Sequence, residues 1–141
     1  MGKILCPTRG GAASYRTQDA AIGLAKEQGK PLIFLFVVDT HFLDRTERAV
    51  RPDVMVEEMA RMGKFLLMMA QERAVAAGVQ TEVRIRRGEL REELVGAVRE
   101  EGADLVILGR PTGEESAFRP ADLEALVATI EEETGAEARI V

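Results

Sequence analysis

A run of seven consecutive apolar residues, Leu32 to Val38, is the feature that most restricts how this chain can fold. The run is too short for a buried helix and is rich in strand-forming residues, so it predicts a strand covered on both faces. A second run of this kind, Leu105 to Leu108, ends at Gly109. Such strands are typical of parallel sheets that have helices on both sides.

The remaining segments alternate between helix and strand patterns that end at glycines or prolines. Apolar spacing predicts helices over 14–28, 54–77, 90–101 and 120–134, and further strands over 3–7, 79–86 and 136–141. The strand over 79–86 alternates apolar and polar residues, which predicts a half-exposed edge strand. We therefore expect an α/β fold with one domain, residues 1–141. It is a three-layer sandwich of five parallel strands, in the order 3-2-1-4-5, with helices on both faces.

The helix expected over 54–77 carries a stripe of methionines. Its members recur at intervals of three and four residues: Met55, Met59, Met62, Leu66 and Met69. Because methionine fills irregular gaps, this spacing predicts a face that packs on the sheet. A cofactor or partner surface is the alternative interpretation.

Charge and hydropathy exclude several classes of partner. The net charge is −5, and there is no dense Lys/Arg run of the kind that nucleic-acid binding needs. The densest basic cluster, Arg84 to Arg87, lies between Glu82 and Glu89, which predicts a solvated strand end. No apolar stretch approaches the ~20 residues of a membrane span, and the first one is too short for a signal peptide. We expect a cytoplasmic protein without nucleic-acid or membrane partners.

The sequence offers little material for catalysis or for a metal site. Its one cysteine, Cys6, lies in an apolar run and is expected to act as a small buried hydrophobe. Its one histidine, His41, lies in a polar connection. Neither a Ser-His-Asp set nor a cluster of metal ligands can be assembled from these residues. We therefore expect no enzyme activity and no metal.

The segments that follow the first and fourth strands both contain arginine and glycine. In a parallel sheet of the expected order, ligands bind beyond the carboxyl ends of these two strands, where the strand order reverses. Glycines allow a close approach to backbone N–H groups, and a following helix adds positive charge. An anion could therefore be held by four side chains together with Gly10 and Gly113: Thr8, Arg9, Arg110 and Thr112.

A purely structural role for the same residues is the alternative. The glycines would then only turn the chain, and the two arginines would pair with acids such as Glu114 and Glu115. The glycine spacing matches neither a Walker loop nor G-x-G-x-x-G, so it does not decide between the two.

Three segments resemble the universal stress protein family. Residues 3–11, KILCPTRGG, resemble the family's first strand and loop, K-I-L-V-P-x-D-G-S. Residues 32–39, LIFLFVVD, resemble L-x-L-x-H-V-V-D, and residues 86–110 resemble G-x-P-x-E-x-I-x-x-x-A-x-x-x-x-A-D-L-I-V-M-G-S. The resemblance implies a Rossmann-like fold of the adenine nucleotide alpha hydrolase type, and a regulatory protein that often binds ATP.

The resemblance also implies which residues line a nucleotide pocket. The matching positions are Pro7, Thr8, Val37, Leu108 and Gly109. However, Arg9 stands where the family has an aspartate. The family's phosphate-binding motif, G-x2-G-x9-G-[S/T], is matched only at its first glycine, and Asp122 and Glu124 lie where its last Gly-Ser would be. These acids would repel a triphosphate.

Together these observations predict a non-catalytic regulatory homodimer with a degenerate nucleotide crevice. The alternative is a protein that binds ATP, AMP or a smaller anion through Arg9, Arg110 and the glycine loops. The homodimer is expected to form through strand 137–141, because a copy of that strand would satisfy its unpaired edge. The competing interpretation is that the charged residues Glu137 and Arg139 keep this edge from pairing with another strand.

Overall fold

The computed structural model describes residues 2–9, 12–39, 52–110 and 120–141. Its strands are Lys3–Pro7 (β1), Leu32–Asp39 (β2), Thr81–Gly88 (β3), Ala103–Leu108 (β4) and Glu137–Ile140 (β5). Its helices in these ranges are Ala12–Gln28 (α1), Pro52–Ala76 (α3), Leu90–Glu101 (α4) and Pro120–Thr134 (α5). None of these helices is both long and apolar enough to cross a membrane.

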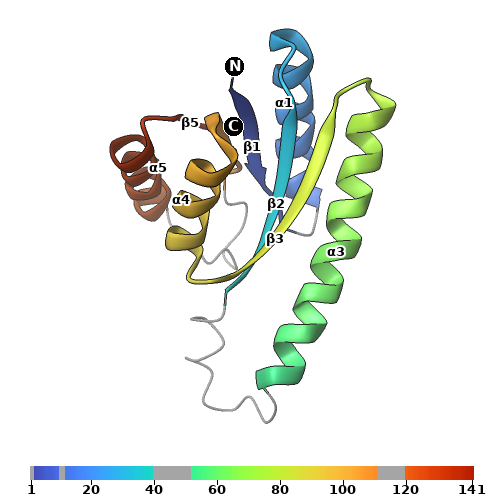
Figure 1. Ribbon diagram of the computed structural model, residues 1–141, viewed down its shortest axis with the longest axis vertical. Helices are drawn as coiled ribbons and strands as arrows, with labels where there is room; N and C mark the ends of the chain where they lie inside the picture. The colour runs from blue at the N-terminus through green and yellow to red at the C-terminus, as the bar shows by residue number, and fades with distance from the viewer. Residues whose placement is uncertain (1, 10–11, 40–51, 111–119) are drawn as a thin grey trace.

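The strands form one parallel sheet in the order β3-β2-β1-β4-β5 (Figure 1). The expected fold class and strand order are therefore confirmed. Helices α1 and α3 cover one face of the sheet, and α4 and α5 cover the other (Figure 1). β3 lies at one edge and has a mixed burial pattern, as its alternating sequence predicted.

Side chains of the central strands alternate between the two helix layers, because successive strand residues point to opposite faces. Phe34 packs toward α1 and α3, whereas Leu35 packs toward α4 and α5. Cys6 is fully buried on the α1 and α3 side. Burial raises the pKa of its thiol to about 12, so Cys6 is a protonated core residue, as expected.

Element bounds agree closely with those predicted from glycines and prolines. α4 stops before Gly102, which has φ 68° and donates its N–H to the Val98 carbonyl, a left-handed helix ending. α1 begins two residues earlier than expected, at Ala12. β3 begins at Thr81 rather than Val79, because the Val79 N–H closes the end of α3 by donating to the Ala74 carbonyl (3.0 Å).

The prediction that the methionine stripe forms the packing face of α3 is wrong for two of its members. Met55 and Met62 are 39% and 52% exposed. The buried face of α3 instead consists of small residues and one leucine: Ala60, Gly63, Leu67, Ala70 and Ala74. Small side chains bring the helix close to the sheet, and the methionines are left on its flanks and outer side.

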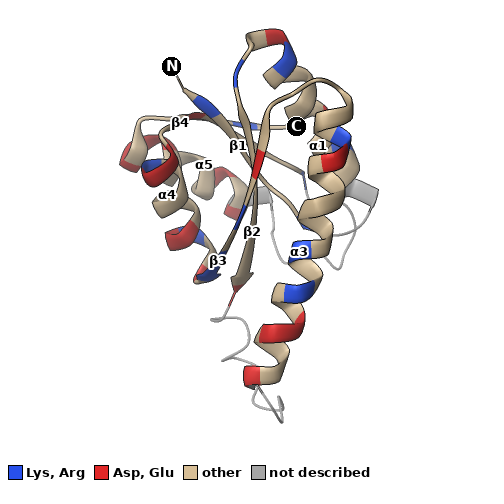
Figure 2. Cartoon of the chain, turned by 45° about the vertical axis from the view of Figure 1, so that its right-hand side comes forward, with Lys and Arg blue, Asp and Glu red and all other residues tan. Residues whose placement is uncertain are grey.

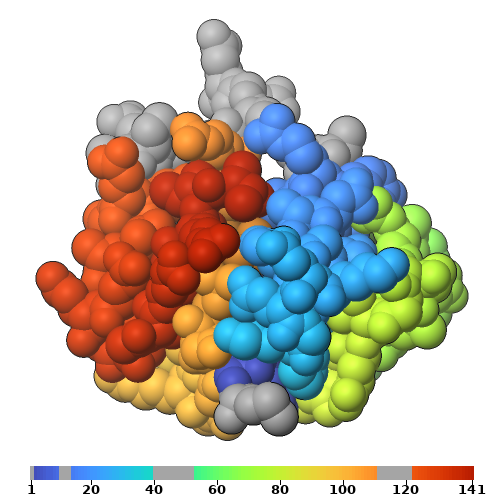
Figure 3. All heavy atoms as spheres, turned by 90° about the horizontal axis from the view of Figure 1, so that it is seen from above, coloured from blue at the N-terminus to red at the C-terminus, as the bar shows by residue number. Residues whose placement is uncertain are grey.

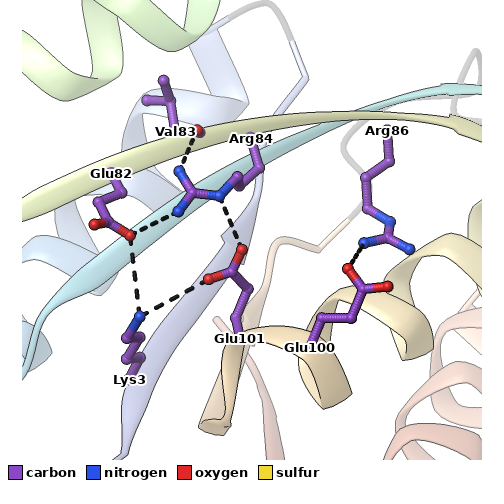
Figure 4. Close-up of polar contacts among 7 residues, drawn as sticks. All are labelled: Lys3, Glu82, Val83, Arg84, Arg86, Glu100 and Glu101. Carbon is purple, nitrogen blue, oxygen red and sulfur yellow. Dashed lines mark hydrogen bonds and ion pairs between the residues drawn. The ribbon is translucent and has the colours of Figure 1, made fainter.

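Two of the three arginines in the basic cluster of β3, Arg84 and Arg86, pair with neighbouring glutamates (Figure 4). Arg84 forms ion pairs with Glu82 (2.9 Å) and Glu101 (2.8 Å). Arg86 pairs with Glu93 (3.0 Å) and Glu100 (2.8 Å). These pairs agree with the expectation of a solvated strand end.

Candidate functional site

The ends of β1 and β4 are adjacent in the sheet, and both are tied to further strands. The Thr8 N–H donates to the Leu35 carbonyl (2.8 Å), which prolongs the pairing of β1 with β2. The Arg110 N–H donates to the Val141 carbonyl (3.1 Å), which prolongs the pairing of β4 with β5. The backbone beyond the two strands is thus fixed at the edge where α1 begins.

The structure brings most of the predicted site residues to this edge of the sheet. Those at the carboxyl ends of β1, β2 and β4 are Pro7, Thr8, Arg9, Val37, Leu108, Gly109 and Arg110. Thr8 is buried, whereas Arg9 and Arg110 are exposed. Gly10, Thr112 and Gly113 lie outside the described residues. Ligand binding by any of these residues stays a prediction.

A chain of hydrogen bonds leads from Thr8 into the layer formed by α1 and α3. Gln18, on α1, donates from Nε2 to Thr8 Oγ1 (2.8 Å), and both residues are only 4% exposed. Arg73, on α3, donates from Nη1 to Gln18 Oε1 (2.7 Å). Because Gln18 has bonds at both ends of its amide, its orientation is fixed and Thr8 Oγ1 acts as an acceptor.

The far end of this chain joins two neighbouring helices. Figure 3 shows α1, in blue, lying beside α3, in green. Arg73 also forms an ion pair with Asp19, and its guanidinium carbon lies 4.8 Å from the centre of the Tyr15 ring. Arg73 thus makes its polar and cation–π contacts with one side of α1. These contacts hold α1, and with it Gln18, in place against Thr8.

Gly109 lies so close to α1 that it leaves no room for a side chain. A Cβ atom on Gly109 would overlap Oγ1 of Thr17 and would lie 3.3 Å from Thr17 Cβ. Thr17 is buried. This glycine therefore has a packing role, in addition to the ligand approach predicted from the sequence.

The electrostatics of the site centre on Arg9 and Asp39. Although Arg9 as a residue is exposed, neighbouring atoms remove part of the hydration of its guanidinium, which lowers the pKa of Arg9. The negative charge of Asp39, at the end of β2, acts in the opposite direction. The guanidinium remains protonated at neutral pH, because arginine is too strong a base to lose its proton there. Asp39 is therefore a nearby acid that offsets part of the Arg9 charge, in agreement with the structural interpretation of this arginine.

The helices that begin near this edge differ in their first turns. α1 has no acidic residue in its first turn, whereas α5 has Asp122. Because the N-terminus of a helix carries a partial positive charge, α1 can favour an anion, while Asp122 occupies that role in α5. In the part of the chain that the structure describes, no group of His, Cys, Asp or Glu could hold a metal ion.

Sequence reasoning missed three residues near the site: Thr17, Gln18 and Arg73. A signal for two of them was present, because Thr17 and Gln18 share the helix face of Ala21 and Ala25, where a polar residue needs a buried partner. No sequence pattern connects Arg73 with Gln18, since 55 residues separate them.

Comparisons with known proteins agree with this architecture. The model of the family described as the universal stress protein family matches residues 1–120. The universal stress protein YxiE of Bacillus subtilis is 29% identical over 125 residues, which cover 77% of this chain and 78% of that protein.

Solved structures give the same result for the fold. The universal stress protein UspA of Lactobacillus plantarum superposes with a TM-score of 0.78 at 18% identity, covering 99% of this chain and 97% of that one. A universal stress protein in complex with cAMP superposes with a TM-score of 0.71 at 24% identity, covering 99% and 96%.

Proposed function

Since the chain belongs to the universal stress protein family, we propose that it is a regulatory homodimer that binds a ligand without transforming it. We propose further that the ligand is an anion with a single phosphate, of the AMP type, held between the ends of β1 and β4. The observation that carries the proposal is Arg9, three residues before the start of α1, together with the first turn of α1, which contains no acid. An arginine and a helix N-terminus together favour a phosphate.

The first turn of α5 supports a monophosphate over a triphosphate. Asp122 is exposed there, and its carboxylate would repel the β and γ phosphates of ATP. A structurally similar universal stress protein has been solved with cAMP, which carries one phosphate. That protein shares only the fold with this chain, so it supports the size of the proposed ligand and not its contacts.

A titration of the nucleotide-stripped protein with AMP, ATP and inorganic phosphate tests this proposal. We expect AMP to bind more tightly than ATP. We expect Arg9→Ala to weaken AMP binding by about tenfold or more, because a charge-assisted contact is lost. Arg99→Ala is the matched control, since Arg99 is exposed in the last turn of α4 and bonds to the Glu133 carbonyl. Equal affinities of the wild type and Arg9→Ala for AMP would remove the arginine from the site.

A dimer that binds a protein partner and no nucleotide is the second candidate. It is favoured by Asp39, which offsets the Arg9 charge, and by Gln18, which already donates to the Thr8 hydroxyl. Absence of binding for all three ligands would support this candidate and contradict the first.

The proposed dimer uses the free edge of β5. Val141 directs its N–H and its carbonyl toward β4, bonding to Leu108 (2.8 Å) and Arg110 (3.1 Å). Because successive residues of a strand point their backbone groups to opposite sides, Ala138 and Ile140 present theirs to the outer edge. There the Ala138 N–H donates to Glu131 Oε2 at 3.5 Å, a long bond that a dimer would replace. Antiparallel pairing with a second copy would give both residues backbone partners.

Substitution of Ile140 with proline tests whether the outer edge of β5 forms the dimer interface. We expect Ile140→Pro to weaken dimerisation by about tenfold or more, because each copy loses one outward N–H. Arg139→Pro is the comparison, since it removes an inward N–H and should lower stability instead. Sedimentation velocity gives the mass and circular dichroism the folding. If the Ile140→Pro variant is folded and dimerises as the wild type does, this edge is excluded as the interface.

A further inference from the structure

The outer side of α3 exposes several large apolar side chains. Phe65 is 62% exposed, Val75 58%, Met68 55% and Met62 52%. The opposite side of the helix packs on the sheet through Gly63, Leu67 and other buried residues, so the exposed side chains have no place in the core. Several exposed apolar side chains on one helix mark an interaction site more often than an isolated exposed residue does.

The exposed residues have the spacing of a helix-pairing surface. We define the outer seam of α3 by seven residues separated by alternating steps of four and three: Val54, Glu58, Arg61, Phe65, Met68, Glu72 and Val75. All seven are exposed. Figure 2 shows α3 in front, with its charged residues separated by a long uncharged stretch. Steps of four and three repeat every seven residues, which is the spacing by which one helix packs along another. The four apolar members are Val54, Phe65, Met68 and Val75, and the other three are charged.

We propose that the outer seam of α3 docks, in antiparallel orientation, against the outer seam of a second copy of this chain. With the two-fold axis between Phe65 and Met68, each Phe65 packs on Met68 of the second copy. One layer outward, Arg61 faces Glu72 of the second copy, and this ion pair occurs twice. The central residues of the seam are thus self-complementary, apolar against apolar and Arg61 against Glu72, as a two-fold symmetric interface requires.

The charges of Arg61 and Glu72 favour a second copy of the chain as the partner and an antiparallel orientation of the two α3 helices. In a parallel, in-register pair, Arg61 would lie against Arg61 of the second copy and Glu72 against Glu72, which is repulsive. Within one chain, the ion pair of Arg61 is with Glu58 at 3.7 Å, between side chains that are 78% and 65% exposed. Such an exposed pair contributes little, so Arg61 can exchange it for Glu72 of the second copy.

This surface is separate from the proposed β5 dimer. α3 packs on β2 and β3, whereas β5 lies at the opposite edge of the sheet. One copy could therefore use both surfaces at the same time, and assemblies larger than a dimer would form at high concentration. The seam involves one helix from each copy, so it is a small interface and its association should be weak.

Charge exchange across the seam tests the proposal, with sedimentation velocity over a range of concentrations as the measurement. We expect Arg61→Glu and Glu72→Arg each to weaken one self-association step by about tenfold or more, because attractive pairs become repulsive. The double variant R61E/E72R restores the ion pair with its signs reversed. It should therefore self-associate as strongly as the wild type does. A 1:1 mixture of the two single variants should associate as well, since their charges complement each other.

Lys26→Glu is the matched control. It makes the same charge change as Arg61→Glu at an exposed position on α1, and it should sediment as the wild type does. The proposal is overturned if Arg61→Glu and Glu72→Arg associate as the wild type does, or if the double variant stays as weak as the single ones. It is also overturned if the wild type shows no self-association step other than the one that Ile140→Pro removes.

Discussion

Replacing Gly63 with alanine should lower the free energy of unfolding by about 2 kcal/mol, although a glycine-to-alanine change within a helix ordinarily raises it by about 1 kcal/mol. The reason is the Phe36 ring. A Cβ atom on Gly63 would overlap ring atom Cδ1 and would lie 2.7 Å from Cε1 and 2.8 Å from Cγ. Phe36 is 5% exposed, so the ring has little space into which it can move, and overpacking costs about 1–3 kcal/mol. Urea denaturation gives the change directly.

Two further variants separate sterics from helix propensity. Gly23, on α1, is exposed and has nothing within 4 Å of the place where its Cβ would be. Gly23→Ala should therefore stabilise the protein by about 0.5–1 kcal/mol. In a Phe36→Leu background, Gly63→Ala should cost much less than in the wild type, because the two sites are in contact. A stabilising effect of Gly63→Ala in the wild type would contradict the packing described here.

The fold could be predicted because each element carried its own local signal. The apolar run of β2 and the alternating residues of β3 gave their positions in the sheet, and Gly102 and Pro120 gave the ends of two helices. The orientation of α3 about its own axis was harder to predict, because almost every face of this helix carries apolar residues. Methionines suggested the packing face, but Gly63 and its neighbouring alanines form it, because close approach to Phe36 needs small side chains.

The candidate site was predictable in position and less so in its contacts. The carboxyl ends of β1 and β4 follow from the strand order alone. The bonds that fix Thr8 do not, because Gln18 and Arg73 belong to helices whose relative placement depends on the whole sheet. The same holds for Arg9, whose charge was visible in the sequence, while the opposing effect of Asp39 depends on the side-by-side pairing of β1 and β2.

Gly109→Ala should lower the free energy of unfolding by about 1–2 kcal/mol, although Gly109 does not have the positive φ that would itself disfavour alanine. The loss comes from overlap with Thr17 Oγ1, which is relieved by a turn of the Thr17 side chain or by a shift of α1. Since α1 also carries Gln18, a shift of this helix should disturb the hydrogen bond to Thr8. Thermal denaturation measures the loss, and the titration with AMP shows whether the crevice changes with it.

The Thr17 side chain supplies the control for Gly109→Ala. Thr17→Ala removes the overlapping atom, so in that background Gly109→Ala should cost little. Thr17→Val keeps an atom of similar size in that place, so in that background Gly109→Ala should remain as costly as in the wild type. If the alanine and valine backgrounds give the same loss, the cost does not arise from Thr17. Gly109 would then be required by the chain that follows β4 rather than by the packing of α1.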